Sequence, residues 1–532
     1  MRKRESNPKP FVYAAPRLLA YDGRSVRSEL QGRLLVSGYV LAALCVGLLS
    51  LPFPRTTQDS PTATYIAQVI LEGGAPYRDA FDVRSPGTFL ISALRVGLFG
   101  ASALAMRLFD FAWQLLTAWL LGRIASRFAR GESAKGLGAC GFVAGALYLM
   151  VYYAQEVGAW TQPEPTMNLF LLASVHFALR AQQKGRLLDW AIAGCFVGMA
   201  ALTKIPFGIL GAGYLALAFP APFSWRALLS RYAALASGLL FPIGLFIAYL
   251  YSKDALHHAY YSQFVVASAY SAHYRATVPP GTISGALARV KTFPLYVIFA
   301  AALAGFRRAA PPLARFHLFF WFWFAAAVVE TITHGSYSSQ HMLALAPPLL
   351  ILAAPLANMW QEERGVLSLR NAALLALLLA ATYPTAQWVR HSRRTVTTYV
   401  QNWHDRDLWS EVGRYIRART LPTEKIYTWG GITSIYVHSE RKAACFVIPS
   451  LFFRFSSPDF NLREDCIRQI RENAPPYIVV GKDRATGPGL LIVDSSMETF
   501  PELESYFREN YVLDKEFRAC WVYRRKDRPP VP

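Results

Sequence analysis

The chain has 532 residues, of which 53% are hydrophobic, 14% aromatic and only 17% charged. An ordinary soluble domain carries about 25% charged residues, so this composition argues against a fully soluble protein. It also excludes intrinsic disorder and a disulfide scaffold. The formal net charge is +21, and most of the excess lies in residues 1–391, between long apolar runs. Because the basic residues do not follow one face, the high isoelectric point does not indicate a nucleic-acid-binding protein.

Long apolar runs in the first 391 residues predict about eleven transmembrane helices. Around 20 helical residues cross the roughly 30 Å of hydrocarbon in a bilayer. The two runs between residues 187 and 220 could instead form one broken element. The predicted spans lie near 33–53, 101–122, 136–153, 165–180, 187–203, 206–220, 233–252, 292–306, 316–333, 342–358 and 371–388.

The distribution of Lys and Arg predicts the orientation in the membrane. Basic residues cluster in the N-terminal tail and in alternate loops, whereas the loops 154–164 and 334–341 contain none. The positive-inside rule then places the N-terminus in the cytoplasm, and an odd number of spans places the C-terminal part outside. The first apolar run lacks a clear cleavage site, which favours a retained anchor over a signal peptide. We therefore expect a cytoplasmic basic tail, a transmembrane domain that includes the first external loop, and an external domain. Their bounds are 1–32, 33–391 with the loop at 54–100, and 392–532.

The C-terminal part changes from membrane-type to soluble-type patterning. Amphipathic helices alternate with apolar strands, which predicts a small α/β domain. The sequence of this domain has no Gly-rich phosphate loop and no metal-ligand spacing, so we expect a structural or acceptor-docking role. Its three cysteines, Cys445, Cys466 and Cys520, allow at most one internal disulfide. The expected helices are 407–419, 461–473 and 501–510, and the expected strands are 425–430, 475–481 and 517–524.

Acidic residues of the membrane domain concentrate on the external side, as an external polar cavity would require. Two fall on the second external segment, Glu156 and Glu164. Four more of the 16 acidic residues in 1–391 fall within the first external loop and are Asp59, Glu72, Asp79 and Asp82.

A short helix is predicted at the start of the first external loop. Ser60 is a suitable N-cap, Pro61 fits the first helical position, and Gly73–Gly74 ends the helix. Its apolar residues recur at helical spacing, which is typical of a helix lying flat at a membrane surface. Asp59 stands at the N-terminus of this helix, where it could be a working carboxylate or merely a cap.

Two arginines follow this helix. Arg78 and Arg84 could bind a phosphate through their planar guanidinium groups. They could equally form ion pairs with Asp79 and Asp82.

Four segments resemble a known family in the expected order along the chain. YIAQVILEGGAPYRDAFDVRSPGTFL (65–90) resembles the first extracytoplasmic loop of bacterial polyprenyl-phosphate-sugar glycosyltransferases, which share the GT-C fold with protein O-mannosyltransferases and the lipid A aminoarabinose transferase. LTKIP (202–206) resembles the family's Lys-Pro break between membrane helices. QHMLALAPPLL (340–350) resembles its late His-containing span, and KIYTWGGITSIYVHSERKAA (425–444) resembles the start of its outer domain.

The resemblance assigns roles residue by residue. Asp59 matches the catalytic Asp of the first loop, and Lys204 matches the intramembrane Lys. Arg84 and Pro86 match the Lys-Pro-Pro that closes the loop. Ser60 replaces a Glu that many members carry, which puts a two-carboxylate or metal role there in doubt. Ser85 stands in place of the first Pro.

The resemblance implies transfer of a sugar from a polyprenyl-phosphate donor to a protein, lipid or glycan acceptor outside the cytoplasm, in a bacterial inner membrane. Such a reaction needs a base at the acceptor and cations at the leaving phosphate. Asp59 is the expected base, and a divalent metal remains open as a cofactor. The expected phosphate-binding residues are Arg84, Lys204 and Arg78, and the expected sugar- or acceptor-binding residues are Asp82, Glu164 and His341.

The same interpretation predicts that Asp59, Arg84 and Lys204 converge on one external cavity, although a Lys at membrane depth could also reach toward a helix end. Three alternatives remain. A transporter or flippase of lipid-linked precursors would more naturally show repeated halves, and the sequence shows no repeat. A non-catalytic assembly factor would not need Asp59. A polymerase or ligase of oligosaccharides with a diphosphate-linked donor is a third alternative.

Overall fold

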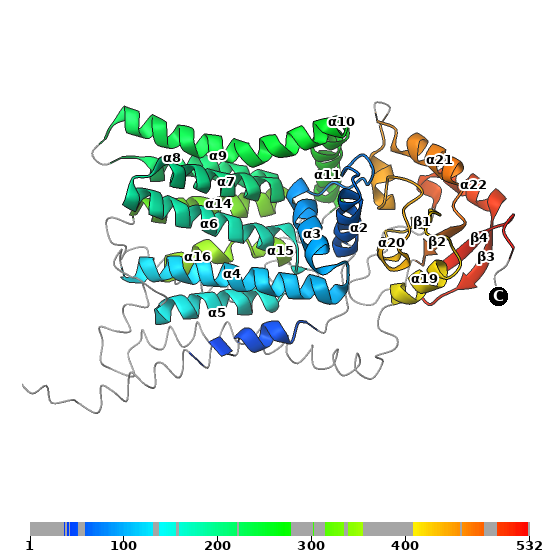
Figure 1. Ribbon diagram of the computed structural model, residues 1–532, viewed down its shortest axis with the longest axis horizontal. Coiled ribbons are helices and arrows are strands. Elements are labelled where there is room, and N and C mark those ends of the chain that lie inside the picture. Colours follow the sequence, from blue (N-terminus) through cyan, green and yellow to red (C-terminus); the bar gives the residue numbers. More distant parts are fainter. Residues whose placement is uncertain are drawn as a thin grey trace, which may run out of the picture.

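The computed structural model describes residues 37, 40–41, 43–51, 59–130, 138–155, 159–220, 223–277, 302, 314–334, 339–354, 408–457, 460–482 and 497–529. The basic tail 1–32 and the predicted span 371–388 lie outside the described residues, as does the predicted span 292–306 except for residue 302. Figure 1 shows a bundle of long helices at one end of the molecule and a smaller domain with a sheet at the other.

The long helices run side by side along the longest axis of the molecule (Figure 1). Within the described residues, three segments are long and apolar enough to cross a membrane, namely Ala103–Ala129, Trp225–Ser252 and Arg315–Thr333. The helix α7 packs extensively against α6 and α9. The bundle consists of α4 (Ala103–Arg130), α5 (Ala139–Tyr153), α6 (Pro163–Lys184), α7 (Leu187–Thr203), α8 (Leu210–Ala218), α9 (Trp225–Ser252), α14 (Ala314–His334), α15 (Ser339–Met342) and α16 (Ala346–Ala353).

Most of the predicted spans that fall on described residues coincide with one helix each. The run 187–220 contains two helices, because Lys204 is extended and is followed by a 3-10 turn, η2 (Ile205–Ile209), before α8 begins. Pro206 has no N–H to donate, so a continuous helix is disfavoured at this point. The span expected at 342–358 begins instead with the short α15, and α16 ends at Ala353.

The segment expected to form the first external loop contains two helices that stand across the bundle, between it and the C-terminal domain (Figure 1). The helix α2 (Asp59–Leu71) begins one residue before the predicted cap Ser60. Gly73 follows it with φ of 87°, a left-handed conformation that glycine adopts without strain. The second helix, α3 (Pro86–Phe99), was expected to be loop.

Gly87 allows α3 to start against the end of α7. A Cβ at this position would lie 2.6 Å from the backbone nitrogen of Thr203. The close approach brings the start of α3 next to the residue before Lys204. Beyond α9, α10 (Leu256–Tyr260), a π-helix η3 (Tyr261–Val266) and α11 (Ala267–Thr277) support the same loop. Here Ser262 donates a 2.7 Å hydrogen bond to the Asp82 carbonyl.

The C-terminal domain is built on a four-stranded sheet in the order β1-β2-β4-β3. The pair β1–β2 is parallel, and the other two pairs are antiparallel. Cys445 and Cys466 form a disulfide, and Cys520 is free. The strands are β1 (Tyr427–Trp429), β2 (Tyr477–Gly481), β3 (Tyr511–Glu516) and β4 (Cys520–Arg525), and the helices are α19 (Leu408–Arg417), α20 (Ser434–Ser439), α21 (Leu462–Asn473) and α22 (Pro501–Asn510), with a 3-10 helix η6 (Ser450–Phe455).

The helix α2 is held between the bundle and the C-terminal domain. The hydroxyls of Thr62 and Thr433 lie 2.7 Å apart, and the Ala443 N–H donates to the Tyr65 hydroxyl at 2.8 Å. The rings of Tyr65 and Tyr436 pack with centroids 5.1 Å apart. One apolar core therefore joins α2, α3 and the sheet domain, so the domain fixes the position of the helix that carries Asp59.

Candidate active site

A pocket opens where α2, α3, α4 and the start of α6 meet. It encloses about 620 Å³ of empty space, part of it open to solvent. Polar residues from all four elements line it, including Asp59, Arg84, Arg95, Asp110 and Gln162. The larger apolar side chains of the wall are Ile91 of α3 and Met106, Phe109 and Trp113 of α4. A pocket with an apolar wall and a few convergent polar groups is the usual form of a small-molecule site.

Asp59 presents its carboxylate to this pocket from the first turn of α2. Its side chain is 52% exposed, and one carboxylate oxygen lies 3.7 Å from the guanidinium of Arg84. The Gln162 side chain donates to the other oxygen at 3.1 Å. An accessible carboxylate that is oriented by a neutral donor and a cation can accept a proton from a bound hydroxyl.

Arg84 is fixed by Asp82, which is 2% exposed and lies beneath it. Two guanidinium nitrogens of Arg84, Nε and Nη2, donate to the two Asp82 oxygens at 2.9 and 2.6 Å, and Nη1 donates to the Asp59 carbonyl. Burial alone would lower the pKa of Arg84, but the attraction of Asp82 outweighs it and the pKa is raised. Arg84 is therefore a charged group whose charge is largely compensated by carboxylates.

Arg78 lies outside this pocket. Its guanidinium donates to both carboxylate oxygens of Asp79, at 2.9 and 2.8 Å, and to the Lys253 carbonyl. Burial raises the pKa of Asp79, but the hydrogen bonds from Arg78 and from the Ala75 N–H more than offset this, so the pKa lies below its usual range. Arg78 thus joins the first loop to the end of α9 rather than facing the site.

Arg95 reaches the same pocket from the middle of α3. It is 5% exposed, and its Nη2 donates to the Thr64 hydroxyl on α2 at 2.6 Å. Its Nη1 has no hydrogen-bond partner among the described residues. Arg95 was not singled out in the sequence, although an Arg inside an apolar run (86–99) is itself a signal of a polar neighbour or ligand.

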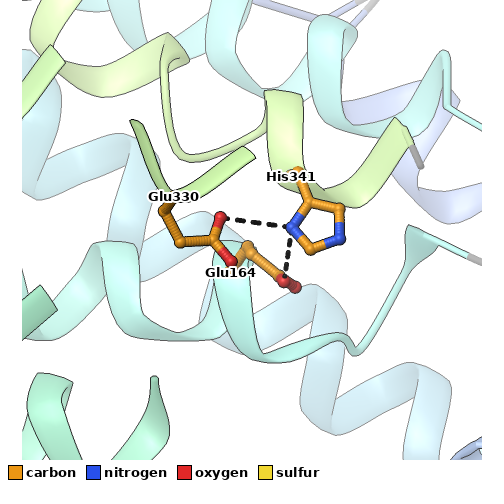
Figure 2. A group of neighbouring side chains, drawn as sticks. All are labelled: Glu164, Glu330 and His341. Atoms are coloured by element: carbon orange, nitrogen blue, oxygen red, sulfur yellow. Dashed lines mark hydrogen bonds and ion pairs between the residues drawn. The ribbon is translucent and has the colours of Figure 1, made fainter. Parts of the chain in front are cut away.

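A second group of polar residues, separate from those that line the pocket, lies within the helical bundle. Lys204 Nζ lies 2.7 Å from Glu164 and 2.9 Å from Glu330, and His341 Nδ1 lies 3.1 and 3.2 Å from the same two carboxylates. Figure 2 shows Glu164, Glu330 and His341 pointing toward one another from separate helices. Glu164, Glu330 and His341 are buried, and Lys204 is 14% exposed. Two acids and two basic groups can compensate one another here, as a buried charge requires.

Glu164, Glu330 and His341 form a possible metal site by distance, because their ligand atoms all lie within 4.8 Å of one another. The donor set fits a metal poorly as it is arranged. The Lys204 ammonium contacts both carboxylates and so takes the place that a cation would occupy. His341 also directs Nδ1 at two carboxylates, which favours an N–H at that nitrogen rather than a lone pair.

The predicted site residues therefore separate into two groups. Asp59, Arg84 and Asp82 lie together at the pocket, whereas Lys204, Glu164 and His341 lie together in the buried cluster. The expected convergence of Asp59 and Arg84 with Lys204 is met only for the first two, since Lys204 does not line the pocket. The two groups are adjacent along the chain, because Gln162 and Pro163 line the pocket and Glu164 follows them.

Glu330 is the member of the cluster that the sequence interpretation missed. Its signal was present, because it is the acid within the apolar span 316–333, and an ionisable residue inside a span has a partner or a function by default. No local pattern connects it to residues more than a hundred positions away.

Comparison with known proteins agrees with the resemblance seen in the sequence. The family described as dolichyl-phosphate-mannose-protein mannosyltransferase matches residues 83–251. The curated undecaprenyl phosphate-alpha-4-amino-4-deoxy-L-arabinose arabinosyl transferase 2 of Proteus mirabilis (strain HI4320) is 32% identical over 127 residues, which are 23% of this chain and 20% of that protein. The chain thus matches about a fifth of the length of this relative.

The solved structures extend the likeness to nearly the whole chain. ArnT from Cupriavidus metallidurans bound to undecaprenyl phosphate superimposes with a TM-score of 0.55 and 12% identity, over 92% of this chain and 97% of that one. The same protein in the apo state gives the same TM-score, identity and coverage. At this identity the likeness shows the fold, so the expected helical, GT-C-type membrane fold is confirmed.

Proposed function

We propose that this chain is an integral-membrane glycosyltransferase that moves a sugar from a polyprenyl-phosphate donor to an acceptor at the extracytoplasmic face. The observation that carries the proposal is the pocket of an ArnT-like fold in which an accessible carboxylate meets arginines beside an apolar wall. The similar Cupriavidus metallidurans structure was solved with undecaprenyl phosphate, which supports a donor of this lipid class.

Asp59 acts as the general base in this proposal. The acceptor's nucleophilic atom forms a bond to the anomeric carbon while its proton passes to the Asp59 carboxylate. The bond from that carbon to the phosphate oxygen breaks, and the electron pair leaves with the lipid phosphate. Arg84 contributes positive charge near this leaving group, and Asp82 holds Arg84 in place.

Lys204, Glu164 and His341 support the pocket rather than touch the donor in this proposal. Their cluster, together with Glu330, fixes the start of α6 against α14 and α15, and thereby fixes Gln162, which holds Asp59. Because Lys204 supplies the cation between the two acids, we expect no dependence on a divalent metal at this cluster. Arg78, which lies away from the pocket, is assigned a structural role.

We further propose the arrangement in the membrane that the sequence predicts, with about eleven spans, a cytoplasmic N-terminus and the C-terminal domain outside. The disulfide between Cys445 and Cys466 supports an external location of that domain, since disulfides persist in oxidising compartments such as the periplasm. The bounds 1–32, 33–391 and 392–532 remain the proposed division, and the bacterial inner membrane is the proposed location.

The test is a donor assay with the purified full chain in lipid nanodiscs. A panel of polyprenyl-phosphate sugars is supplied with cell-envelope acceptors, and loss of donor is followed over time. We expect one donor to be consumed, and we expect Asp59→Asn to slow its consumption by about 10²–10⁴-fold, the usual contribution of a general base. Addition of a chelator should leave the rate unchanged.

Glu72→Gln serves as the matched control, because Glu72 is a first-loop acid that pairs with exposed Lys442 away from the pocket. It should react as the wild type does. If the wild type consumes no donor of the panel, the proposed function is wrong. If Asp59→Asn is as fast as Glu72→Gln, the role of Asp59 is wrong even though the protein is a transferase.

A further inference from the structure

Arg95 differs from Arg84 and Lys204 in having no ion pair with an acid among the residues that the structure describes. Arg84 is paired with Asp82 and Asp59, and Lys204 with two glutamates. The hydrogen-bond partner found for Arg95 within the described part of the chain is Thr64, a neutral hydroxyl. A buried charge without a counter-charge costs free energy, so Arg95 is poised for an anion that arrives from outside the chain.

The position of Arg95 allows that anion to come through the pocket. Its side chain lines the pocket while being 5% exposed, and its Nη1 lacks a partner among the described residues. Thr88, Ile91 and Ser92 lie on the same face of α3, at the helical spacing of Arg95. A guanidinium with a free edge offers the planar donor pair that matches phosphate oxygens.

The wall near Arg95 also suits the remainder of a lipid donor. Met106, Phe109 and Trp113 of α4 line the pocket beside it, so the anion that binds there meets apolar surface on one side. This combination fits an amphiphilic phosphate better than a free sugar phosphate. The eight residues from Thr88 to Arg95 rise about 10 Å along the helix, so Arg95 lies about two turns beyond the start of α3, before which Arg84 contacts Asp59.

We propose that Arg95 binds the phosphate of the polyprenyl donor and directs the sugar toward Asp59. This inference rests on the proposed function. It also divides the roles of the two arginines. Arg84, whose charge is compensated by carboxylates, orients Asp59 and lies near the leaving group, and Arg95 supplies the uncompensated charge that selects an anionic lipid.

The test measures lipid binding by the full chain in nanodiscs, with undecaprenyl phosphate and undecaprenol as paired probes. They share the tail and differ in the phosphate. We expect the wild type to prefer the phosphate, and Arg95→Gln and Arg95→Met to lose at least tenfold of that preference while binding undecaprenol unchanged. Arg226→Gln, which changes an exposed arginine on α9, should keep the preference. An Arg95→Gln protein with the wild-type preference would overturn the inference.

Two further measurements keep the inference testable. Removing an uncompensated charge should not lower the melting temperature of the ligand-free protein, whereas a merely structural Arg95 would lower it and keep the lipid preference. In the wild type, a diazirine on the isoprene unit next to the phosphate should label residues 88–95 of α3 or the facing turns of α4. Labelling elsewhere would overturn the inference. If the wild type binds undecaprenyl phosphate through Arg95 but consumes no sugar donor, only the proposed function fails.

Discussion

The buried cluster around Lys204 allows a quantitative test of how the bundle is held together. Lys204 contacts Glu164 at 2.7 Å and Glu330 at 2.9 Å. In Lys204→Met both acids lose their ammonium partner, and His341 alone remains to compensate them. Removing one partner of a buried ion pair typically costs about 3–5 kcal/mol, because the other charge stays buried.

This cost can be converted to a melting shift. Globular proteins unfold with an entropy of about 2.1 cal/mol/K per residue. For cooperative unfolding of all 532 residues this corresponds to about 1.1 kcal/mol/K, so the variant should melt roughly 3–5 °C lower. The assay is thermal unfolding in detergent, followed by near-ultraviolet circular dichroism and by aggregation. Lys184→Met, which removes an exposed lysine at the end of α6, is the control and should melt with the wild type.

The same reasoning predicts that a second substitution in this cluster restores stability. Adding Glu330→Gln to Lys204→Met removes the surplus negative charge, so the double variant should recover part of the lost stability. A coupling free energy of about 0.5–3 kcal/mol is typical of contacting charged residues. If Lys204→Met melts with the control, or if the double variant melts below the Lys204→Met single variant, the cluster is not held by charge compensation and the account is refuted.

Two other predictions concern the C-terminal domain and the loop after α2. Cys445→Ala should destabilise the C-terminal domain by about 2–4 kcal/mol, because the Cys445–Cys466 disulfide closes a loop of 21 residues and restricts the unfolded chain; a reductant should produce the same shift in the wild type but none in the variant. Asp79 has a lowered pKa, so its stabilising contribution is present above its unfolded pKa of about 3.9 and is lost as the pH falls through its lower folded value. Asp79→Asn should therefore lower the melting temperature at pH 7 but much less at pH 3, and an equal effect at both values would contradict the sign.

Cap and turn residues in the sequence predicted a helix boundary well where neighbouring residues alone determine it. Pro61 and the Gly73–Gly74 pair bounded α2 to within one residue at its start, since turn and cap chemistry depends on neighbours in sequence. The C-terminal helices α19, α21 and α22 and the strands β1, β2 and β4 followed from periodicity in the same way, whereas the short α20 was not predicted. The helix α3 was missed because its residues 86–99 were interpreted as the end of an external loop, and β3 because its exposed, charged residues lack the apolar alternation of a buried strand.

The grouping of the site residues could not be obtained from the sequence. Asp59 and Arg84 were expected together because one loop carries both. Lys204 does not join them, because its side chain pairs with Glu330 inside the bundle. Glu330 lies more than a hundred residues away along the chain. Long-range ion pairs of this kind follow from helix packing, which apolar spans of similar composition do not specify.

The contacts of α2 give the C-terminal domain a role in the proposed active site. Asp59 is at the first residue of α2, and α2 buries one side against α20 through Thr62 and Tyr65. The loop after it pairs with the same domain, since the Phe81 N–H donates to the Phe446 carbonyl at 2.8 Å. Without these contacts the apolar residues of α2 would face water, and the helix is too short to be stable alone. The C-terminal domain therefore determines where Asp59 stands, although no residue of it lines the pocket in the part of the chain that the structure describes.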